Sequence, residues 1–219
     1  KNMNLSKLVD DDEPLFLDLL RDVFTGVQVD SQVDEEVQSA IIKNARDSGL
    51  DPFPAWLEKV NQLFETSEVR HGIMILGHSG SGKSACLHTL IKALSDVRGA
   101  HRLIVMNPKA ITSSQMFGIL DPSSNDWTDG IFSSLWRIAC DVDPVWIESL
   151  NSVLDDNKTL TLANGDRLPM PNSVKLLFEV SSLDNASPAT VSRAGMIYIP
   201  SHVLKWRPIA ECWVKKEDF

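Results

Sequence analysis

A glycine-rich loop followed by Lys-Ser constrains this chain more than any other feature. Residues 77–84 match every fixed position of the phosphate-binding loop G-x-x-x-x-G-K-[ST]. The predicted phosphate-binding residues are Gly77, His78, Ser79, Gly80, Ser81, Gly82, Lys83 and Ser84. In such loops, backbone N–H groups converge on the phosphates, the lysine reaches the β- and γ-oxygens, and the serine hydroxyl ligates Mg²⁺. The loop therefore predicts a site for a nucleoside triphosphate with Mg²⁺.

The residues on both sides of the loop supply the structural context that this motif requires. Residues 73–76 are an apolar run typical of a buried strand, and residues 85–94 place their leucines and isoleucine on one helical face. A strand, a loop and a helix in this order favour a nucleotide site over the alternative interpretation, which is a loop that is rich in glycine and serine by chance.

Composition and charge limit the classes of partner. The chain has 219 residues, 43% of them hydrophobic, which is enough for a buried core. A net charge of −9 argues against nucleic acid as the main partner. Because no apolar run approaches about 20 residues and residues 1–10 lack the layout of a secretory signal, we expect a soluble intracellular protein with no membrane partner.

The three cysteines are odd in number and widely spaced, which favours reduced packing residues over disulfides or a zinc cluster. Cys86 lies two positions after the loop serine, so a bound nucleotide could shield its thiol from reagents.

The first 70 residues are expected to be helical. Pro14 favours the start of a helix that ends near residues 24–26, and two further helices are expected at residues 33–45 and 55–65. In the third of these, Trp56, Val60 and Phe64 are spaced four apart and form one face.

The rest of the chain alternates between strand and helix patterns. Strands are expected at 103–106, 174–180 and 196–199, helices at 113–119 and 145–154, and a β-hairpin around Asn164-Gly165, with its strands at 158–162 and 167–170. Such alternation predicts an α/β fold with a mainly parallel sheet flanked by helices, and it places the nucleotide at the carboxyl ends of the strands.

Five strings carry a resemblance to a known family. They are residues 107–112 (Asn-Pro-Lys-Ala-Ile-Thr), 120–122 (Leu-Asp-Pro), 126–132 (Asp-Trp-Thr-Asp-Gly-Ile-Phe), 146–157 (Trp-Ile-Glu-Ser-Leu-Asn-Ser-Val-Leu-Asp-Asp-Asn) and 189–193 (Ala-Thr-Val-Ser-Arg). With these strings, nearly the whole chain resembles a dynein heavy chain of axonemal type. It is most similar to the second AAA+ module of the motor ring, together with the lead-in from the first module.

This resemblance implies an AAA+ P-loop NTPase fold in three parts. Residues 1–70 would be a helical lead-in, residues 71–202 the nucleotide-binding core with a β-hairpin insert, and residues 203–219 the truncated start of a helical lid that is otherwise missing. It also implies ATP and Mg²⁺ as cofactors. The implied partners are the neighbouring AAA+ modules and other dynein chains, with microtubules reached only through the intact motor, in the cytoplasmic cytoskeleton of a ciliary axoneme.

One expected part of the site departs from the family pattern. The resemblance implies an apolar Walker B strand ending in an aspartate, but residues 132–140 run straight into Asp141-Val142-Asp143-Pro144. This predicts that about a dozen or more residues are missing here.

Two interpretations of Asp141 stay open. Residues 138–141 could form a shortened strand with Asp141 as the carboxylate that orders Mg²⁺, or Asp141 and Asp143 could cap the helix at 145–154. Neither supplies a general base: Glu148 would lie inside that helix, and Glu179 lies in the strand at 174–180, near the position of a polar nucleotide sensor. Because losing a general base typically costs 10²- to 10⁴-fold in rate, we expect ATP to be bound with little or no hydrolysis.

Arg193 has a functional and a structural interpretation. By resemblance it would be an arginine finger that reaches the γ-phosphate of the neighbouring module and stabilises the charge that develops there. The alternative is a surface arginine paired with Asp184 or Glu179.

The resulting hypothesis is an ATP-binding ring module with a structural or regulatory role. Two other functions remain open: a self-sufficient NTPase, and a scaffold whose loop binds nothing. A measurement of nucleotide binding distinguishes the scaffold, which would bind none, from the ring module. A measurement of ATP turnover distinguishes the self-sufficient NTPase from both.

Overall fold

The computed structural model describes residues 12–25, 34–107, 110–121, 123–124, 126–140, 158–161, 167–170, 173–183, 192–201 and 214. The chain divides into two compact units, which are considered separately. The loop unit consists of residues 1–103, 177–185 and 195–219, and the hairpin unit consists of residues 104–176 and 186–194. In the described part of the chain, no helix has the length and apolar character needed to cross a membrane.

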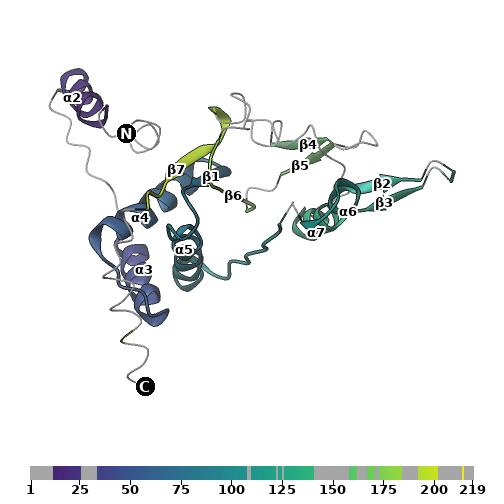
Figure 1. Ribbon diagram of the computed structural model, residues 1–219, viewed down its shortest axis with the longest axis horizontal. Coiled ribbons are helices and arrows are strands. Elements are labelled where there is room, and N and C mark those ends of the chain that lie inside the picture. The colour runs from purple at the N-terminus through teal and green to yellow at the C-terminus, as the bar shows by residue number, and fades with distance from the viewer. Residues whose placement is uncertain are drawn as a thin grey trace. The chain divides into compact units, whose positions relative to one another are not determined.

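The three helices expected before the loop are present (Figure 1). Helix α2 (Glu13–Val23) has Pro14 in its first turn and ends where the Phe24 N–H donates to the Leu20 carbonyl. Helix α3 (Glu35–Asp47) is capped by Asp34, whose side chain accepts from the Val37 N–H. Helix α4 (Pro54–Val69) is one turn longer than predicted and also starts at a proline, as expected of a residue without a backbone N–H.

Among the described residues, the loop unit has a sheet of three strands in the order β6-β1-β7. Strand β1 (Gly72–Leu76) runs parallel to β7 (Gly195–Tyr198), with Ile73 opposite Gly195 and Leu76 opposite Tyr198. Strand β6 (Leu176–Val180) lies on the other side of β1, and the N–H of Gly77, the residue after β1, donates to the carbonyl of Val180, the last residue of β6. The carboxyl ends of the three strands therefore meet at one edge, which confirms the predicted parallel α/β arrangement.

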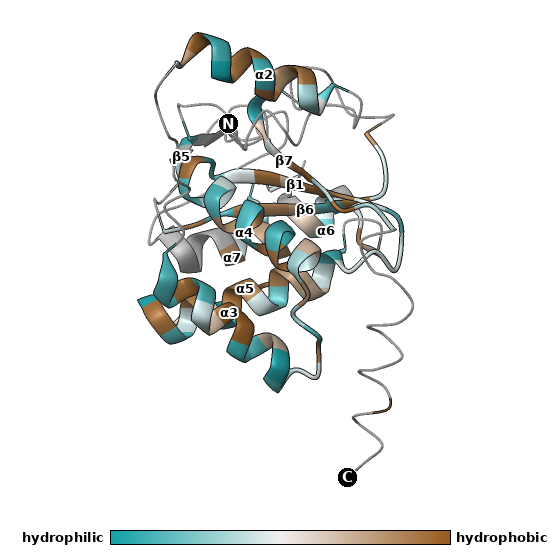
Figure 2. Cartoon of the chain, turned by 90° about the vertical axis from the view of Figure 1, so that its left-hand side faces the viewer, coloured by the Kyte–Doolittle hydropathy of each residue, from teal (hydrophilic) through white to brown (hydrophobic). Residues whose placement is uncertain are grey.

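Helices α3, α4 and α5 (Lys83–Arg98) bury one continuous core with the sheet (Figure 2). Helix α4 lies against β1 and β7 and contacts α5, which in turn packs on α3. Trp56, Val60 and Phe64 of α4 are at most 7% exposed, so the predicted apolar face is the one that packs. Gly195 lets α4 approach β7, because a Cβ there would lie 2.4 Å from Thr66 Cγ2.

The strand predicted at residues 103–106 is wrong. Residues 101–107 form no regular structure, and Val105 is 76% exposed, although Leu103 packs against the core of the loop unit. An apolar run becomes a strand only where a neighbouring strand takes up its backbone hydrogen bonds, and none of the described strands pairs with this run.

In the described part of the hairpin unit there are two antiparallel strand pairs and two helices. Its elements are α6 (Ser113–Phe117), β2 (Gly118–Leu120), β3 (Trp127–Asp129), α7 (Ile131–Cys140), β4 (Thr159–Thr161) and β5 (Arg167–Pro169). Strand β4 pairs with β5 and confirms the predicted hairpin, although its turn lies outside the described residues. The helix expected at 145–154 also lies outside them.

The helix predicted at 113–119 is shorter than expected. It begins with a capping box between Thr112 and Gln115 and ends at Phe117, after which Gly118 starts β2. Gly118 has a φ of +120°, and a Cβ there would lie 2.4 Å from the Trp127 ring. The pairing of β2 with β3 therefore ends the helix before residue 119, where the apolar pattern had predicted its end. Gly118 permits this because its backbone conformation and its contact with Trp127 both require glycine.

Candidate nucleotide site

The loop at 77–82 leaves the end of β1 and leads directly into α5, as the motif predicts. Gly82 precedes the helix in the left-handed conformation, with φ of +88°. Gly77 has a φ of +152°, and a Cβ there would lie 2.4 Å from the Ile199 carbonyl oxygen and 2.6 Å from Ser81 Oγ. Both positions therefore need glycine, Gly82 for its backbone conformation and Gly77 also for space.

Hydrogen bonds to both neighbouring strands fix the start of the loop. The Gly77 N–H donates to the Val180 carbonyl at 3.2 Å, and the Ile199 N–H donates to the Leu76 carbonyl at 2.8 Å. The loop therefore lies at the carboxyl edge of the sheet, which is where open α/β folds bind their ligands.

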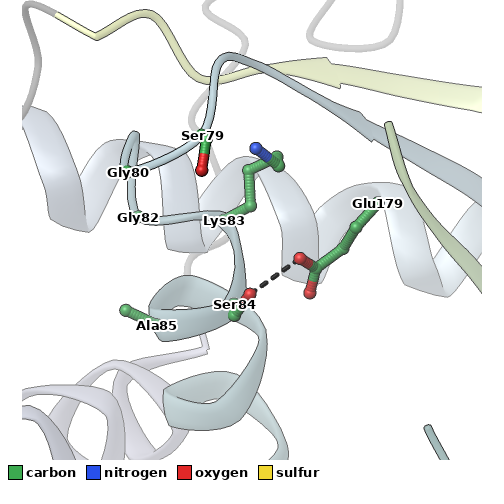
Figure 3. A pocket seen from close by; sticks show the side chains of 7 residues that line it. All are labelled: Ser79, Gly80, Gly82, Lys83, Ser84, Ala85 and Glu179. Carbon is green, nitrogen blue, oxygen red and sulfur yellow. Dashed lines mark hydrogen bonds between the residues drawn. The ribbon is translucent and has the colours of Figure 1, made fainter. Parts of the chain in front are cut away.

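An open pocket of about 330 Å³ lies beside the loop (Figure 3). It is lined by Ser79, Gly80, Gly82, Lys83, Ser84, Ala85 and Glu179. Five of the eight residues predicted from the motif thus face one space. Gly77 shapes the turn, and His78 has an exposed side chain and contributes its carbonyl oxygen to a contact with Lys83.

The Lys83 ammonium group is held over the loop by backbone carbonyl groups. Its Nζ donates to the carbonyl oxygens of Gly77 at 2.7 Å and His78 at 2.8 Å. These contacts keep a positive charge at the mouth of the loop, where the helix N-terminus also favours negative charge.

Ser81 carries a polar group that the described residues do not satisfy. Its side chain is 1% exposed, and its Oγ has no hydrogen-bond partner in the described part of the chain. A buried hydroxyl without a partner costs free energy, so a water molecule or a phosphate oxygen that reached this atom would be favoured. Together with the glycine turn and Lys83, this hydroxyl makes the loop fit a bound polyphosphate.

Glu179 also lines the pocket: the sequence placed it near the position of a polar nucleotide sensor but did not pair it with Ser84. Ser84 Oγ donates to Glu179 Oε2 at 2.7 Å, although the two residues are 95 positions apart (Figure 3). The sequence feature that could have indicated this contact was a single acidic residue in the otherwise apolar strand β6. The pairing could not be read from that signal alone, because it depends on β6 lying next to β1.

Cys86 is a core residue. Its side chain is fully buried, and this burial raises the pKa of the thiol to about 12, with only partial compensation from a hydrogen bond with Trp56. The packing of α5 against α4 therefore keeps this thiol protonated and covered, so bound nucleotide is not needed to shield it.

The two remaining predicted site residues are not placed at this pocket. Asp141 lies outside the described residues. The shortened strand proposed to present it is wrong, because residues 138–140 form the last turn of α7. Arg193 is half-buried in a helical turn two residues before β7 and belongs to the hairpin unit.

Comparison with known protein families gives two matches that together cover most of the chain. Residues 1–84 match the hydrolytic ATP binding site of the dynein motor region, and residues 72–194 match the AAA domain of the dynein-related subfamily.

The chain is also similar to curated axonemal and flagellar proteins over its whole length. It is 56% identical to dynein axonemal heavy chain 8 of Mus musculus and to dynein axonemal heavy chain 5 of Rattus norvegicus. It is 47% identical to the dynein gamma chain of the flagellar outer arm of Chlamydomonas reinhardtii. All of this chain is covered in each case, and it spans 5% to 7% of the length of these relatives.

Proposed function

The chain belongs to the dynein-related AAA domains of the dynein heavy chains, and from this premise we propose that it holds Mg-ATP in a structural or regulatory role, with little hydrolysis of its own. The observation that carries this proposal is the loop at the carboxyl edge of the sheet, with Lys83 and Ser84 facing one pocket. ATP bound there would brace the module against its neighbour in a motor ring.

The residues present fit a magnesium-bound nucleotide. Ser84 would hold Mg²⁺ through its hydroxyl, Lys83 would exchange its two carbonyl contacts for phosphate oxygens, and the loop N–H groups would surround the phosphates. The metal would screen the negative charge of the triphosphate. Asp141 stays a predicted additional metal ligand.

Slow hydrolysis follows from the side chains that line the pocket. Among the described residues, Glu179 supplies the pocket's single carboxylate, and Ser84 already occupies one of its oxygens. Alignment with the mouse relative extends over 232 positions, 13 more than the 219 residues of this chain. An excess of this size fits the loss of about a dozen residues, and we place that loss before Asp141, where the Walker B pattern is interrupted.

Steady-state phosphate release by the purified chain is expected to be below about 0.1 s⁻¹. A typical enzyme turns over at about 10 s⁻¹, and loss of the general base lowers the rate by roughly 10²- to 10⁴-fold. The measurement is phosphate release with saturating Mg-ATP, with Lys83→Ala as the control for contaminating ATPase. Turnover near 1 s⁻¹ that disappears in Lys83→Ala would show instead a self-sufficient NTPase.

Arg193 is proposed to act on the neighbouring module. The support is the string at 189–193 together with the planar, permanently charged guanidinium, which suits the charge that develops on a transferring phosphoryl group. In this role, Arg193 would complete the hydrolytic site of the preceding module and would leave the loop at 77–84 unaffected.

In a full heavy chain that carries this module, Arg193→Ala should lower the motor ATPase by roughly 10³-fold or more. Arg193→Lys keeps the charge but loses the fork of donors, so only partial recovery is expected. Binding of a fluorescent ATP analogue at residues 77–84 is measured in parallel and should not change. Loss of that binding with normal ATPase would reject the assignment.

The named relatives also support a location and a set of partners. Because they are axonemal and flagellar proteins, we propose that this chain works in the cytoskeleton of a cilium or flagellum. Its direct contacts would be the adjacent AAA modules and other dynein chains, and microtubules would be reached through the complete motor.

A further inference from the structure

We propose that Glu179 is a magnesium ligand of this site and acts with Ser84, so that strand β6 supplies a carboxylate that the shortened region before Asp141 would otherwise provide. This proposal deepens the proposed function and rests on it, because the metal would arrive with the nucleotide.

The spacing of the two oxygen atoms carries the proposal. Ser84 Oγ and Glu179 Oε2, which both line the pocket, are 2.7 Å apart (Figure 3). Mg²⁺ takes six oxygen ligands at 2.0–2.1 Å in a nearly regular octahedron, so two adjacent ligands lie about 2.9 Å apart. The two oxygens therefore already have almost the separation of neighbouring magnesium ligands. A metal ion could bind both oxygens with little movement of either side chain, because the Ser84 hydroxyl would keep its proton and only turn it away from Glu179.

The backbone supports both groups rigidly. Ser84 is the second residue of α5, and Glu179 lies in β6 next to β1, from which the loop begins. The bond between Gly77 N–H and Val180 O ties the loop to the residue that follows Glu179. The carboxylate and the hydroxyl are thus presented by ordered elements, which suits the demand of Mg²⁺ for a fixed geometry.

The negative charge of Glu179 predicts an effect on nucleotide binding that depends on whether Mg²⁺ is present. Without metal, the Glu179 carboxylate would face the triphosphate with a charge of the same sign and would weaken its binding. With Mg²⁺ between them, the same carboxylate would strengthen binding. Removal of this charge should therefore have opposite effects in the two conditions, whereas a general base or a purely structural residue would not produce such a reversal.

The test compares binding of the mant derivative of ATP to the full chain and to Glu179→Gln, in Mg²⁺ and in EDTA. The glutamine keeps the shape of the side chain and can still accept from Ser84, but it loses the charge. In EDTA, Glu179→Gln should bind the analogue at least as tightly as the parent chain. In Mg²⁺, its Kd should rise by roughly 10- to 100-fold or more, because the loss of a group that only supports a metal ligand already costs that much.

Two further variants separate the alternatives. Glu58→Gln changes an exposed glutamate of α4 and should leave both Kd values unchanged. Asp141→Asn, which removes the predicted additional ligand, should weaken the Mg²⁺ effect less than Glu179→Gln does. Mn²⁺ electron paramagnetic resonance reads the metal directly, and Glu179→Gln should release most of the Mn²⁺ held with ATP.

The possible results distinguish failure of nucleotide binding from failure of the metal-ligand role of Glu179. If the parent chain binds no analogue in either condition, the proposed nucleotide function fails first. If it binds, and Glu179→Gln keeps the full Mg²⁺ effect and its bound Mn²⁺, then Glu179 is not a ligand. Loss of the metal effect in Asp141→Asn alone would move the role to Asp141 and overturn the proposal.

Discussion

Lys83→Ala is expected to abolish the stabilisation that Mg-ATP gives this chain. A ligand present at 100 times its Kd adds about 2.7 kcal/mol to the free energy of unfolding. Lys83 lines the pocket and is predicted to contact the β- and γ-phosphates, so its removal should raise the Kd enough to eliminate that gain. The measurement is thermal unfolding of the parent chain and the variant, each with and without Mg-ATP.

The quantity to compare is the shift caused by the nucleotide. Lys83 also holds the Gly77 and His78 carbonyls, so its removal lowers the midpoint even without ligand. Lys92→Ala is the matched control, because it removes an exposed lysine from the same helix α5, where the ammonium group contacts only Ser48 Oγ at 3.1 Å among the described hydrogen bonds. This control should retain the full shift. An unchanged shift in Lys83→Ala, or no shift in the parent chain, would contradict nucleotide binding at the loop and favour the scaffold interpretation.

Trp56→Ala is expected to destabilise the loop unit by about 3–5 kcal/mol, the usual cost of truncating a buried aromatic side chain to alanine. Trp56 is 2% exposed and belongs to the core that joins α3, α4, α5 and the sheet. Its interaction with Cys86 places it against the first turn of α5, immediately after the phosphate-binding loop. The cavity should therefore also loosen the helix that carries Lys83 and Ser84. Urea unfolding measures the first effect, and the Kd for the mant-ATP analogue measures the second.

Glu58→Ala provides the comparison on the same helix. Glu58 is exposed and interacts with Gln62, so its replacement should change the free energy of unfolding by less than about 0.5 kcal/mol. If Trp56→Ala costs less than about 1 kcal/mol, then α4 is not an integral part of the core. Helices before the loop would then be a separate lead-in to the nucleotide site.

Much of this fold could be predicted from local sequence signals. Prolines and periodic apolar residues identified α2, α3 and α4, and the glycine-lysine-serine loop identified the junction of β1 and α5. The apolar runs of β1, β6 and β7 and the pairing of β4 with β5 were also correct. Each of these patterns acts over a few residues and needs no knowledge of distant contacts.

The errors arose where a distant partner decides the local structure. Residues 103–106 have the composition of a strand but no partner among the described strands, and residues 138–140 continue a helix rather than form a strand. At Gly118, the close approach of Trp127 ends a helix that the apolar pattern would extend.

The sequence by itself determined the family, the parallel α/β class and the position of the phosphate-binding loop, because these depend on contiguous motifs. Only the tertiary structure brought Glu179 to Ser84 across 95 positions and placed Trp56 beneath the helix that follows the loop. The physical reason is that strand order and helix packing are set by the burial of apolar surface over the whole core. A single acidic residue in a strand cannot reveal which edge of the sheet it faces until that order is fixed.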